Sequence, residues 1–200
     1  MAGTENGRRH TRDDVARTAL QILDEYGLPD LTMRRLAAAL DVQPSALYWH
    51  FPNKQTLLAE LADRIVTPVG DERDESDAPL SARVATAALR DALLTYRDGA
   101  EVVSTTLALG LGSSVARDRL TAAIVADGFD ADLAQRAATA LLHFVLGHVS
   151  HEQQRLQYDS IGVVVPDASI SAQGRDDPAA EFAFGVDLLI GGLELSRSRA

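Results

Sequence analysis

Three large side chains with polar groups stand next to one another in a short segment bounded by prolines. Tyr48, Trp49 and His50 lie between Pro44 and Pro52. Proline suits the first position of a helix and stops a helix further along, so a helix from Pro44 spans about two turns. Adjacent residues of a helix do not share a face, so a helix this short cannot bury all three. Their hydroxyl, indole and imidazole groups suit a polar groove such as that of double-stranded DNA.

The residues before this segment predict the helix that would support it. Leu36 and Leu40 share one face of a short helix, and Thr32 stands where its N-cap is expected. Asp41 and Val42 follow as a turn. The spacing predicts a helix-turn-helix, the arrangement that places its second helix in the major groove of DNA.

The second, recognition helix is expected over Pro44–Phe51. Ala46, Leu47 and Phe51 are predicted to point inward, and Asn53 is predicted to cap the next helix. The alternative is an αα-hairpin whose aromatic residues pack against another part of the protein. Pattern alone leaves that alternative open.

The sequence contains no recognisable catalytic motif. No GxSxG, HExxH, P-loop or dinucleotide-binding glycine motif occurs, so an enzyme is not predicted. His148, His151 and Glu152 have helical spacings that suit a divalent metal. Histidines that are exposed or line a pocket are more common, so neither a metal nor another cofactor is predicted.

Composition limits the class of protein. The 200 residues contain no cysteine, which excludes disulfides and thiolate metal sites. No apolar run is long enough to span a membrane and the N-terminus has no apolar signal segment, so we expect a cytoplasmic protein without a membrane partner. The net charge is −10, but residues 1–64 are nearly neutral. The basic residues of the expected arm and helix-turn-helix are Arg8, Arg9, Arg12, Arg34, Arg35 and Lys54.

Apolar periodicity predicts an all-α fold in two parts. Residues 1–66 are expected to form a three-helix helix-turn-helix domain, with residues 1–10 as a disordered arm, and residues 67–200 a helical bundle. Loops are expected at 70–79 and 158–177. The other expected helices cover residues 11–26, 53–66, 80–97, 101–111, 113–128, 131–157 and 178–196.

Parts of the sequence resemble a known family. The run LTMRRLAAALDVQPSALYWHFPNKQTLL, Leu31–Leu58, closely resembles the DNA-binding domain of the tetracycline repressor (TetR) family, and LYWHFPNK is its most specific part. LLTYRDGAEVV, Leu93–Val103, and HFVLGHVSHEQ, His143–Gln153, resemble the ligand-binding core of the tetracycline repressor subgroup. The resemblance covers roughly residues 10–155, and more loosely the last helix.

This resemblance implies a homodimeric, ligand-responsive transcription regulator. A repressor would bind a palindromic operator and be released by a small molecule; the competing hypothesis is a helical carrier or enzyme that retains a degenerate DNA-binding head. By resemblance, base or groove contacts fall on Arg34, Gln43, Pro44 and Ser45. Phosphate contacts fall on Thr32, Tyr48, His50 and Lys54, and Trp49 belongs to the same surface.

The resemblance also implies which residues meet the effector. Val103 stands where tetracycline-binding members have a metal-ligating histidine, and His151 stands where they have an acidic residue. Ala85 and Leu89 replace an asparagine and a phenylalanine. The expected ligand-binding residues are Ala85, Leu89, Val103, Thr106, Ala138, His143 and His151. The pocket is therefore expected to be metal-free and more apolar, with an uncharged or weakly polar effector.

The longest helices are expected to form the dimer. Helices 131–157 and 178–196 would pair with their symmetry mates in a four-helix bundle. Gly191 and Gly192 disfavour a helix, and close approach of a partner helix would compensate.

Overall fold

In the parts of the chain that the computed structural model describes, residues 10–67, 80–112, 114–160, 162 and 177–197, every regular element is an α-helix. This confirms the all-α prediction. Most of the predicted arm, the loop at 70–79 and most of the loop at 158–177 lie outside these ranges. The helices are α1 (Arg12–Tyr26), α2 (Met33–Ala39), α3 (Pro44–Leu47), α4 (Lys54–Val66), α5 (Ala82–Leu94), α6 (Gly99–Ala108), α7 (Val115–Ala126), α8 (Ala131–Ser160) and α9 (Pro178–Arg197).

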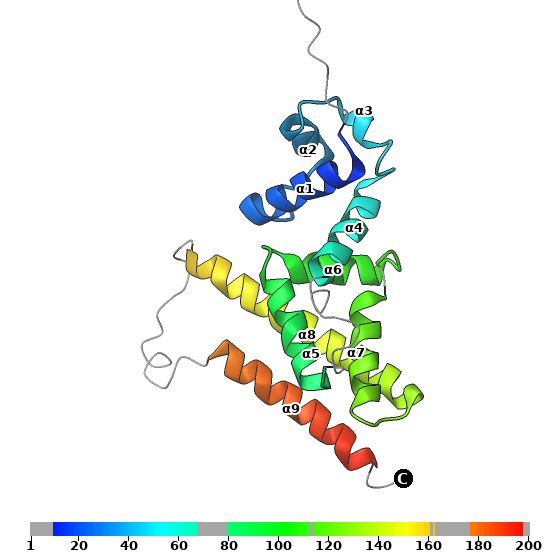
Figure 1. The fold of residues 1–200 in the computed structure, drawn as a ribbon. Coiled ribbons are helices and arrows are strands. Elements are labelled where there is room, and N and C mark those ends of the chain that lie inside the picture. The colour runs from blue at the N-terminus through cyan, green and yellow to red at the C-terminus, as the bar shows by residue number, and fades with distance from the viewer. Residues whose placement is uncertain (1–9, 68–79, 113, 161, 163–176, 198–200) are drawn as a thin grey trace, which may run out of the picture.

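The helices form a head and a body. Figure 1 shows α1, α2 and α3 gathered at one end, α5 to α9 at the other, and α4 running from the first group to α6. We call α1–α4 the head and α5–α9 the body. No helix within the described ranges is long and apolar enough to cross a bilayer.

Side-chain caps start α1, α2 and α4, and the caps of α2 and α4 were predicted. The Thr11 hydroxyl accepts the Asp14 amide at 3.1 Å, and the Asp14 carboxylate accepts the Thr11 amide at 2.9 Å. Thr32 caps α2 through the Arg35 amide, and Asn53 caps α4 through the Thr56 amide. Each cap satisfies an amide that has no partner inside its own helix.

The recognition helix is shorter than predicted. Helical hydrogen bonding covers Pro44–Leu47, and the segment to Phe51 is a turn in which the amides of His50 and Phe51 both bond the Leu47 carbonyl at 2.9 Å. The prediction that Ala46 points inward was wrong, because Leu47 and Phe51 fill the inward face and leave Ala46 exposed. α5 also ends three residues early, at Leu94, and α8 continues to Ser160.

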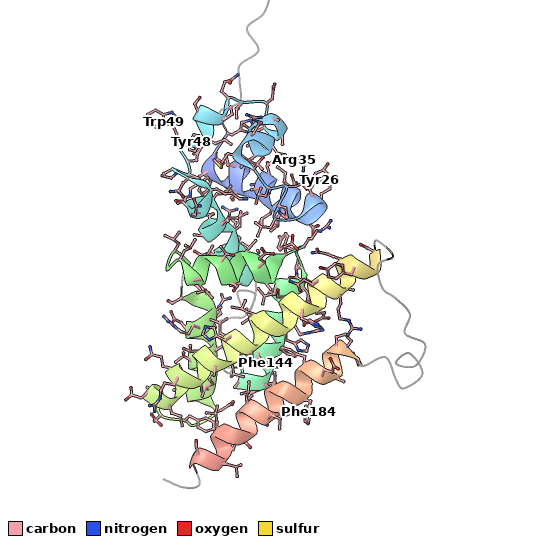
Figure 2. All side chains as sticks on the ribbon, turned by 180° about the vertical axis from the view of Figure 1, so that it is seen from behind. Tyr26, Arg35, Tyr48, Trp49, Phe144 and Phe184 are labelled. Carbon is pink, nitrogen blue, oxygen red and sulfur yellow. The ribbon has the colours of Figure 1, made fainter. Side chains whose placement is uncertain are left out.

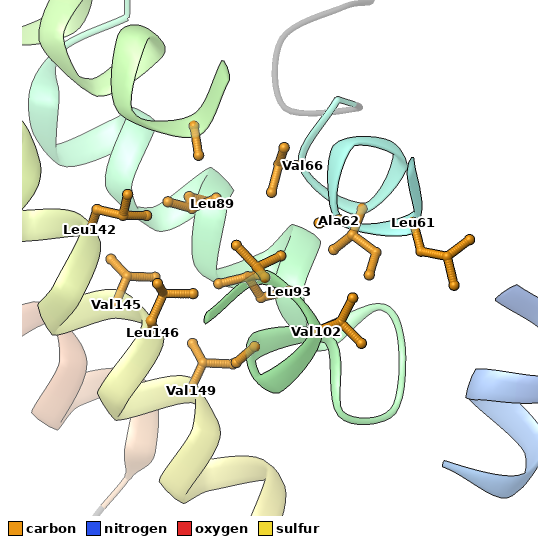
Figure 3. Close-up of a cluster of buried hydrophobic side chains, with 14 of the residues drawn as sticks. Leu61, Ala62, Val66, Leu89, Leu93, Val102, Leu142, Val145, Leu146 and Val149 are labelled. Atoms are coloured by element: carbon orange, nitrogen blue, oxygen red, sulfur yellow. The ribbon is translucent and has the colours of Figure 1, made fainter. Parts of the chain in front are cut away.

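One apolar cluster joins the head to the body through α4. Figure 3 shows Ala62 and Val66 of α4 on one side of Leu93 of α5, near Val102 of α6, and the labelled residues of α8 on the other side of Leu93. All of these side chains belong to one buried core. The labelled residues are Leu61, Ala62, Val66, Leu89, Leu93, Val102, Leu142, Val145, Leu146 and Val149.

The C-terminal end of α4 is also held by the body. The Arg119 guanidinium of α7 donates to the carbonyls of Val66 and Thr67, both at 2.7 Å. The last carbonyls of a helix lack helical partners and carry partial negative charge, which a cation stabilises. α4 is therefore anchored to both α6 and α7.

An ion pair and two aromatic rings fix α9 against α5 and α8. Arg90 and Glu152 form a bidentate pair at 2.7–3.2 Å, and both side chains are 13% exposed. The Arg90 guanidinium lies 5.4 Å from the Phe182 ring centroid, and Phe182 stacks on Phe144 at 5.6 Å. A Cβ at Gly185 would collide with the Phe144 ring, so glycine permits this close helix packing.

Two glutamines of α8 hold the turn between α5 and α6. The Gln153 amide nitrogen donates to the carbonyls of Leu93 at 3.0 Å and Tyr96 at 2.9 Å, and its oxygen accepts the Ala100 amide at 3.3 Å. One helical turn further on, Gln157 donates to Asp98. The α5–α6 turn is thereby fixed on α8.

The same turn reaches the head through Asp98. Its other carboxylate oxygen accepts the Leu28 amide, just beyond α1, at 2.8 Å. Asp98 holds the left-handed conformation, φ 57°, and a Cβ at Gly27 would come within 2.8 Å of its carboxylate. The end of α1 therefore contacts the α5–α6 turn of the body directly. This contact is additional to the connection between head and body that α4 makes.

We expect Gln153→Ala to destabilise the fold markedly. The change leaves buried groups of Leu93, Tyr96 and Ala100 without their partner, and an unsatisfied buried group costs about 1–3 kcal/mol. Urea unfolding followed by far-UV circular dichroism should show a loss of at least about 2 kcal/mol. Gln154→Ala is the matched control, because that neighbour is exposed and Gln153 is 7% exposed. Equal stability of the two variants would contradict a stabilising role of the Gln153 hydrogen bonds.

Candidate nucleic-acid interface and effector residues

The outer end of the head exposes two aromatic side chains. Trp49 is 91% exposed and Tyr48 is 47% exposed. Figure 2 shows both at the edge of the head, on the side away from α8 and α9. Leu47, just before them, and Phe51, two residues after Trp49, are buried in the core. The αα-hairpin alternative required these aromatic residues to pack within the protein, and in this structure they do not.

The other predicted DNA-contacting residues are also accessible. They come from the start of α2, from α3 and the turn after it, and from the start of α4. His50 and Lys54 are half-buried, and the rest are exposed. The exposed residues are Thr32, Arg34, Gln43, Pro44, Ser45, Tyr48 and Trp49.

Arg12 fixes the turn that carries these aromatic residues. Its guanidinium donates to the His50 carbonyl at 3.1 Å and to the Glu60 carboxylate at 2.8 Å. It also lies 4.4 Å from the centroid of the Phe51 ring, a cation–π contact. Arg12 thus joins α1, the turn and α4. Arg12 was predicted only as a basic residue of the arm and helix-turn-helix, and its positioning role was not predicted.

The partner of Arg12 stays ionised at neutral pH. Partial burial alone would raise the pKa of Glu60, but hydrogen bonds from Arg12 and Arg64 outweigh burial and hold its pKa below the ordinary value. Arg64 also donates to Asp13 of α1 at 2.6 Å. Charged contacts therefore tie α1 to α4 beside the exposed surface.

Neighbouring arginines of α2 have different surroundings. Arg35 donates to Asp30 at 2.7 Å, and its guanidinium lies 4.1 Å from the Tyr26 ring centroid. Figure 2 shows Arg35 beside Tyr26, across the head from Trp49. Arg34 is exposed and forms no ion pair among the described residues. Arg34 and Lys54 are thus the better placed cations for an external anion, while Arg8 and Arg9 lie outside the described ranges.

Five of the predicted effector-binding residues lie inside the body. The structure buries Ala85, Leu89, Val103, Thr106 and Ala138. The Thr106 hydroxyl donates within its own helix, to the carbonyls of Val102 at 3.1 Å and Val103 at 2.9 Å. This leaves the hydroxyl oxygen as an acceptor only.

The two histidines predicted to bind the effector lie on the exposed side of α8, away from the five buried residues. His143 and His151 are exposed on α8. The buried face of this helix carries Ala134, Ala138 and Leu141, and at 100° per residue His143 falls on nearly the opposite side. The structure therefore does not bring these histidines together with the five buried residues of the same subunit.

The histidine–glutamate spacing of α8 is used for packing. Glu152 forms the ion pair with Arg90, and the His148 Nε2 lies 3.2 Å from the Pro178 carbonyl of α9. No group of three His, Cys, Asp or Glu side chains within the described ranges is arranged to hold a metal ion.

Comparison with known families finds matches in both parts of the chain. Residues 16–61 match the model described as bacterial regulatory proteins, tetR family. Residues 75–162 match the tetracyclin repressor-like, C-terminal domain.

Similar proteins cover nearly the whole chain. It is 35% identical to the class C tetracycline repressor protein of Escherichia coli, over 93% of this chain and 91% of that protein. A crystal structure of BioQ with its natural double-stranded DNA operator is 39% identical, with a TM-score of 0.72, over 92% of this chain and 98% of that one. A TetR variant from Acinetobacter baumannii AYE in complex with minocycline is 30% identical, with a TM-score of 0.71, over 94% and 98% of the two chains.

Proposed function

This chain belongs to the tetR family of bacterial regulatory proteins, and from that premise we propose how it binds its operator and its effector. It is a ligand-responsive DNA-binding repressor and not an enzyme. Its partners are operator DNA and a small molecule, as the BioQ operator complex and the minocycline complex indicate. We place its action in the cytoplasm, where the operator is. The hypothesis of a carrier or enzyme with a degenerate head is thereby set aside.

The exposure of Tyr48 and Trp49 is the main observation that supports the proposed DNA-binding surface. A helix-turn-helix that leaves two aromatic rings in solvent presents the surface that a groove would cover. In our proposal Arg34, Gln43, Pro44 and Ser45 meet base edges or the groove floor, and Thr32, Tyr48, His50 and Lys54 meet phosphates. Trp49 lies on the same surface. The first group gives sequence preference and the second gives position.

Effector binding is proposed to act through α4. This helix packs on α6 and is capped by Arg119 of α7, so a shift of either body helix changes the tilt of the head. Two heads bind a palindrome only when their spacing matches the two half-sites. An effector that favours a body conformation with another spacing releases the operator.

The effector pocket is proposed to be apolar and to need both subunits. Ala85, Leu89, Val103 and Ala138 offer no polar group, and Thr106 offers an acceptor. His143 and His151 face away from these residues within one subunit. We propose that they reach the effector across the dimer interface, which would make ligand response a property of the dimer.

The dimer is proposed to form through α8 and α9, residues 131–157 and 178–196. Phe184 and Leu188 of α9 are 66% and 61% exposed, and Leu195 of the same helix is exposed too. A Cβ at Gly147, Gly191 or Gly192 would meet no atom of the same subunit within 4 Å. Exposed apolar side chains on the helices that carry open glycine positions suit a closely packed partner helix. Figure 2 shows Phe184 on the outer side of α9, while Phe144 lies between α9 and α8.

Lys54→Ala should weaken binding to all DNA sequences alike. Losing one phosphate contact should make the dependence of log affinity on log salt shallower by about one unit. Gel-shift titrations at several salt concentrations, with DNA from the promoter beside its own gene, measure this salt dependence.

Arg34→Ala should also weaken DNA binding. In addition it should reduce the preference for the operator over other sequences, by about 1–3 kcal/mol, because a base contact is lost. Arg117→Ala, exposed on α7 and outside the proposed DNA and dimer surfaces, is the control, and wild-type binding by both head variants would overturn the proposed interface.

Gly191→Leu should disrupt the dimer while the subunit stays folded. The new side chain meets no atom of its own subunit near the Cβ, so only a partner can exclude it. Sedimentation velocity should show monomers where the wild type shows dimers, and operator affinity should fall. Ala122→Leu is the control, because it adds the same side chain at an exposed position of α7, outside the proposed interface. A wild-type protein that sediments as a monomer at micromolar concentration would refute the assembly.

Tetracycline with magnesium should not bind tightly. Val103 is buried and offers no lone pair where tetracycline-binding members ligate the metal, and His151 cannot supply the negative charge of their acidic residue. Titration followed by tetracycline fluorescence, with and without magnesium, should show no submicromolar, magnesium-dependent binding. Such binding would refute the apolar, metal-free pocket. Val103→His combined with His151→Glu should restore more magnesium dependence than either change alone.

A further inference from the structure

A cavity of about 480 Å³ lies where the head meets the body. Its walls come from the end of α1 and the following turn, from the start of α6, and from the last turns of α8. Pockets of this volume hold small organic molecules. None of its residues belongs to the proposed DNA surface or effector pocket. The lining residues are Tyr26, Pro29, Asp30, Arg97, Asp98, Glu101, Gln154, Gln157 and Tyr158.

The charges of this junction cavity favour a cation. Three carboxylates line it, against the single guanidinium of Arg97. Asp30 is paired with Arg35, and both oxygens of Asp98 accept hydrogen bonds. Glu101 is exposed and forms no ion pair among the described residues. Its negative charge therefore remains available to a ligand.

Two aromatic rings favour a flat, apolar ligand body. Tyr26 and Tyr158 come from helices of the head and the body, and both are about half exposed. The Arg35 guanidinium packs on the Tyr26 ring at 4.1 Å from its centroid and so holds this wall of the cavity in place. We propose that the junction cavity is a second small-molecule site, separate from the effector pocket, and that it binds a small aromatic cation.

Occupancy of this site would change operator affinity, a consequence that rests on the proposed function. A ligand that touches Tyr26 and Glu101 together spans the joint that the Leu28–Asp98 hydrogen bond closes. Such a ligand binds best when head and body have the relative orientation of this structure, so its binding favours this orientation of the head. By linkage, DNA that selects another orientation binds more weakly in its presence.

Binding of 1-methylquinolinium to the full-length protein tests the site directly. Its uncharged counterpart, 2-methylquinoline in mildly alkaline buffer, has the same flat shape. Isothermal titration and ligand-observed NMR should show binding of the cation in clear preference to the neutral compound. Glu101→Gln should weaken cation binding about three- to fivefold, the effect of one partly exposed charge pair. Tyr158→Ala should weaken both compounds, by about threefold or more for the cation.

A matched control separates the site from general attraction to an acidic protein. Asp132→Asn removes an exposed charge from the first turn of α8, and it should bind the cation as the wild type does. Equal binding of the two compounds, or wild-type binding of the cation by both Glu101→Gln and Tyr158→Ala, would overturn the proposal.

The regulatory consequence needs one further titration. Operator binding by the unliganded protein is measured first, because its failure would concern the proposed function and leave cation binding unaffected. 1-Methylquinolinium at a concentration near its wild-type Kd should then shift the operator affinity, and Glu101→Gln should reduce the shift in proportion to the occupancy that it loses at the same concentration. An operator affinity that does not change although the cation binds would overturn the regulatory role.

Discussion

The position of the head depends on one helix that is buried on two sides. α4 contributes Ala62 and Val66 to the cluster with α5 and α6, and its Leu57, Leu58 and Leu61 are buried in the same core. The core that joins head and body is incomplete without it, and exposing apolar surface to water costs about 25 cal/mol per Å². The head therefore cannot swing while α4 stays in place. In the proposed response to the effector, the head and α4 move together over α6, because packed cores switch between discrete arrangements rather than deform continuously.

Local chemistry in the sequence predicted most of the fold. Thr32 and Asn53 were expected as caps and are caps, because an N-cap needs only its own next three residues. The length of the recognition helix was not predictable in that way. Its last turn is set by how Leu47 and Phe51 fit the buried core, so Ala46 was placed on the wrong side. Where tertiary packing decides a helix end, local pattern is a weak guide.

In the candidate sites, too, features that depend on local sequence were predicted, and features that depend on residues far apart in the chain were not. Exposure of Tyr48 and Trp49 followed from the shortness of their segment. The roles of Arg12 and Asp98 did not follow, since Glu60 lies 48 residues from Arg12 and Leu28 lies 70 residues from Asp98. No local signal carries such a pairing. His143 is different, because the helical period already put it opposite Ala134 and Ala138, and only the family resemblance suggested that His143 and Ala138 line one pocket.

Trp49 gives this protein a built-in optical reporter. It is the single tryptophan of the chain, and its indole stands almost wholly in water at the outer edge of the head. Tryptophan emission from the protein therefore originates at one place, and that place is the surface proposed to dock on a groove. Events in the body change the emission only if they reach the head. Colour and intensity of the emitted light would thus follow engagement of this edge without any attached dye.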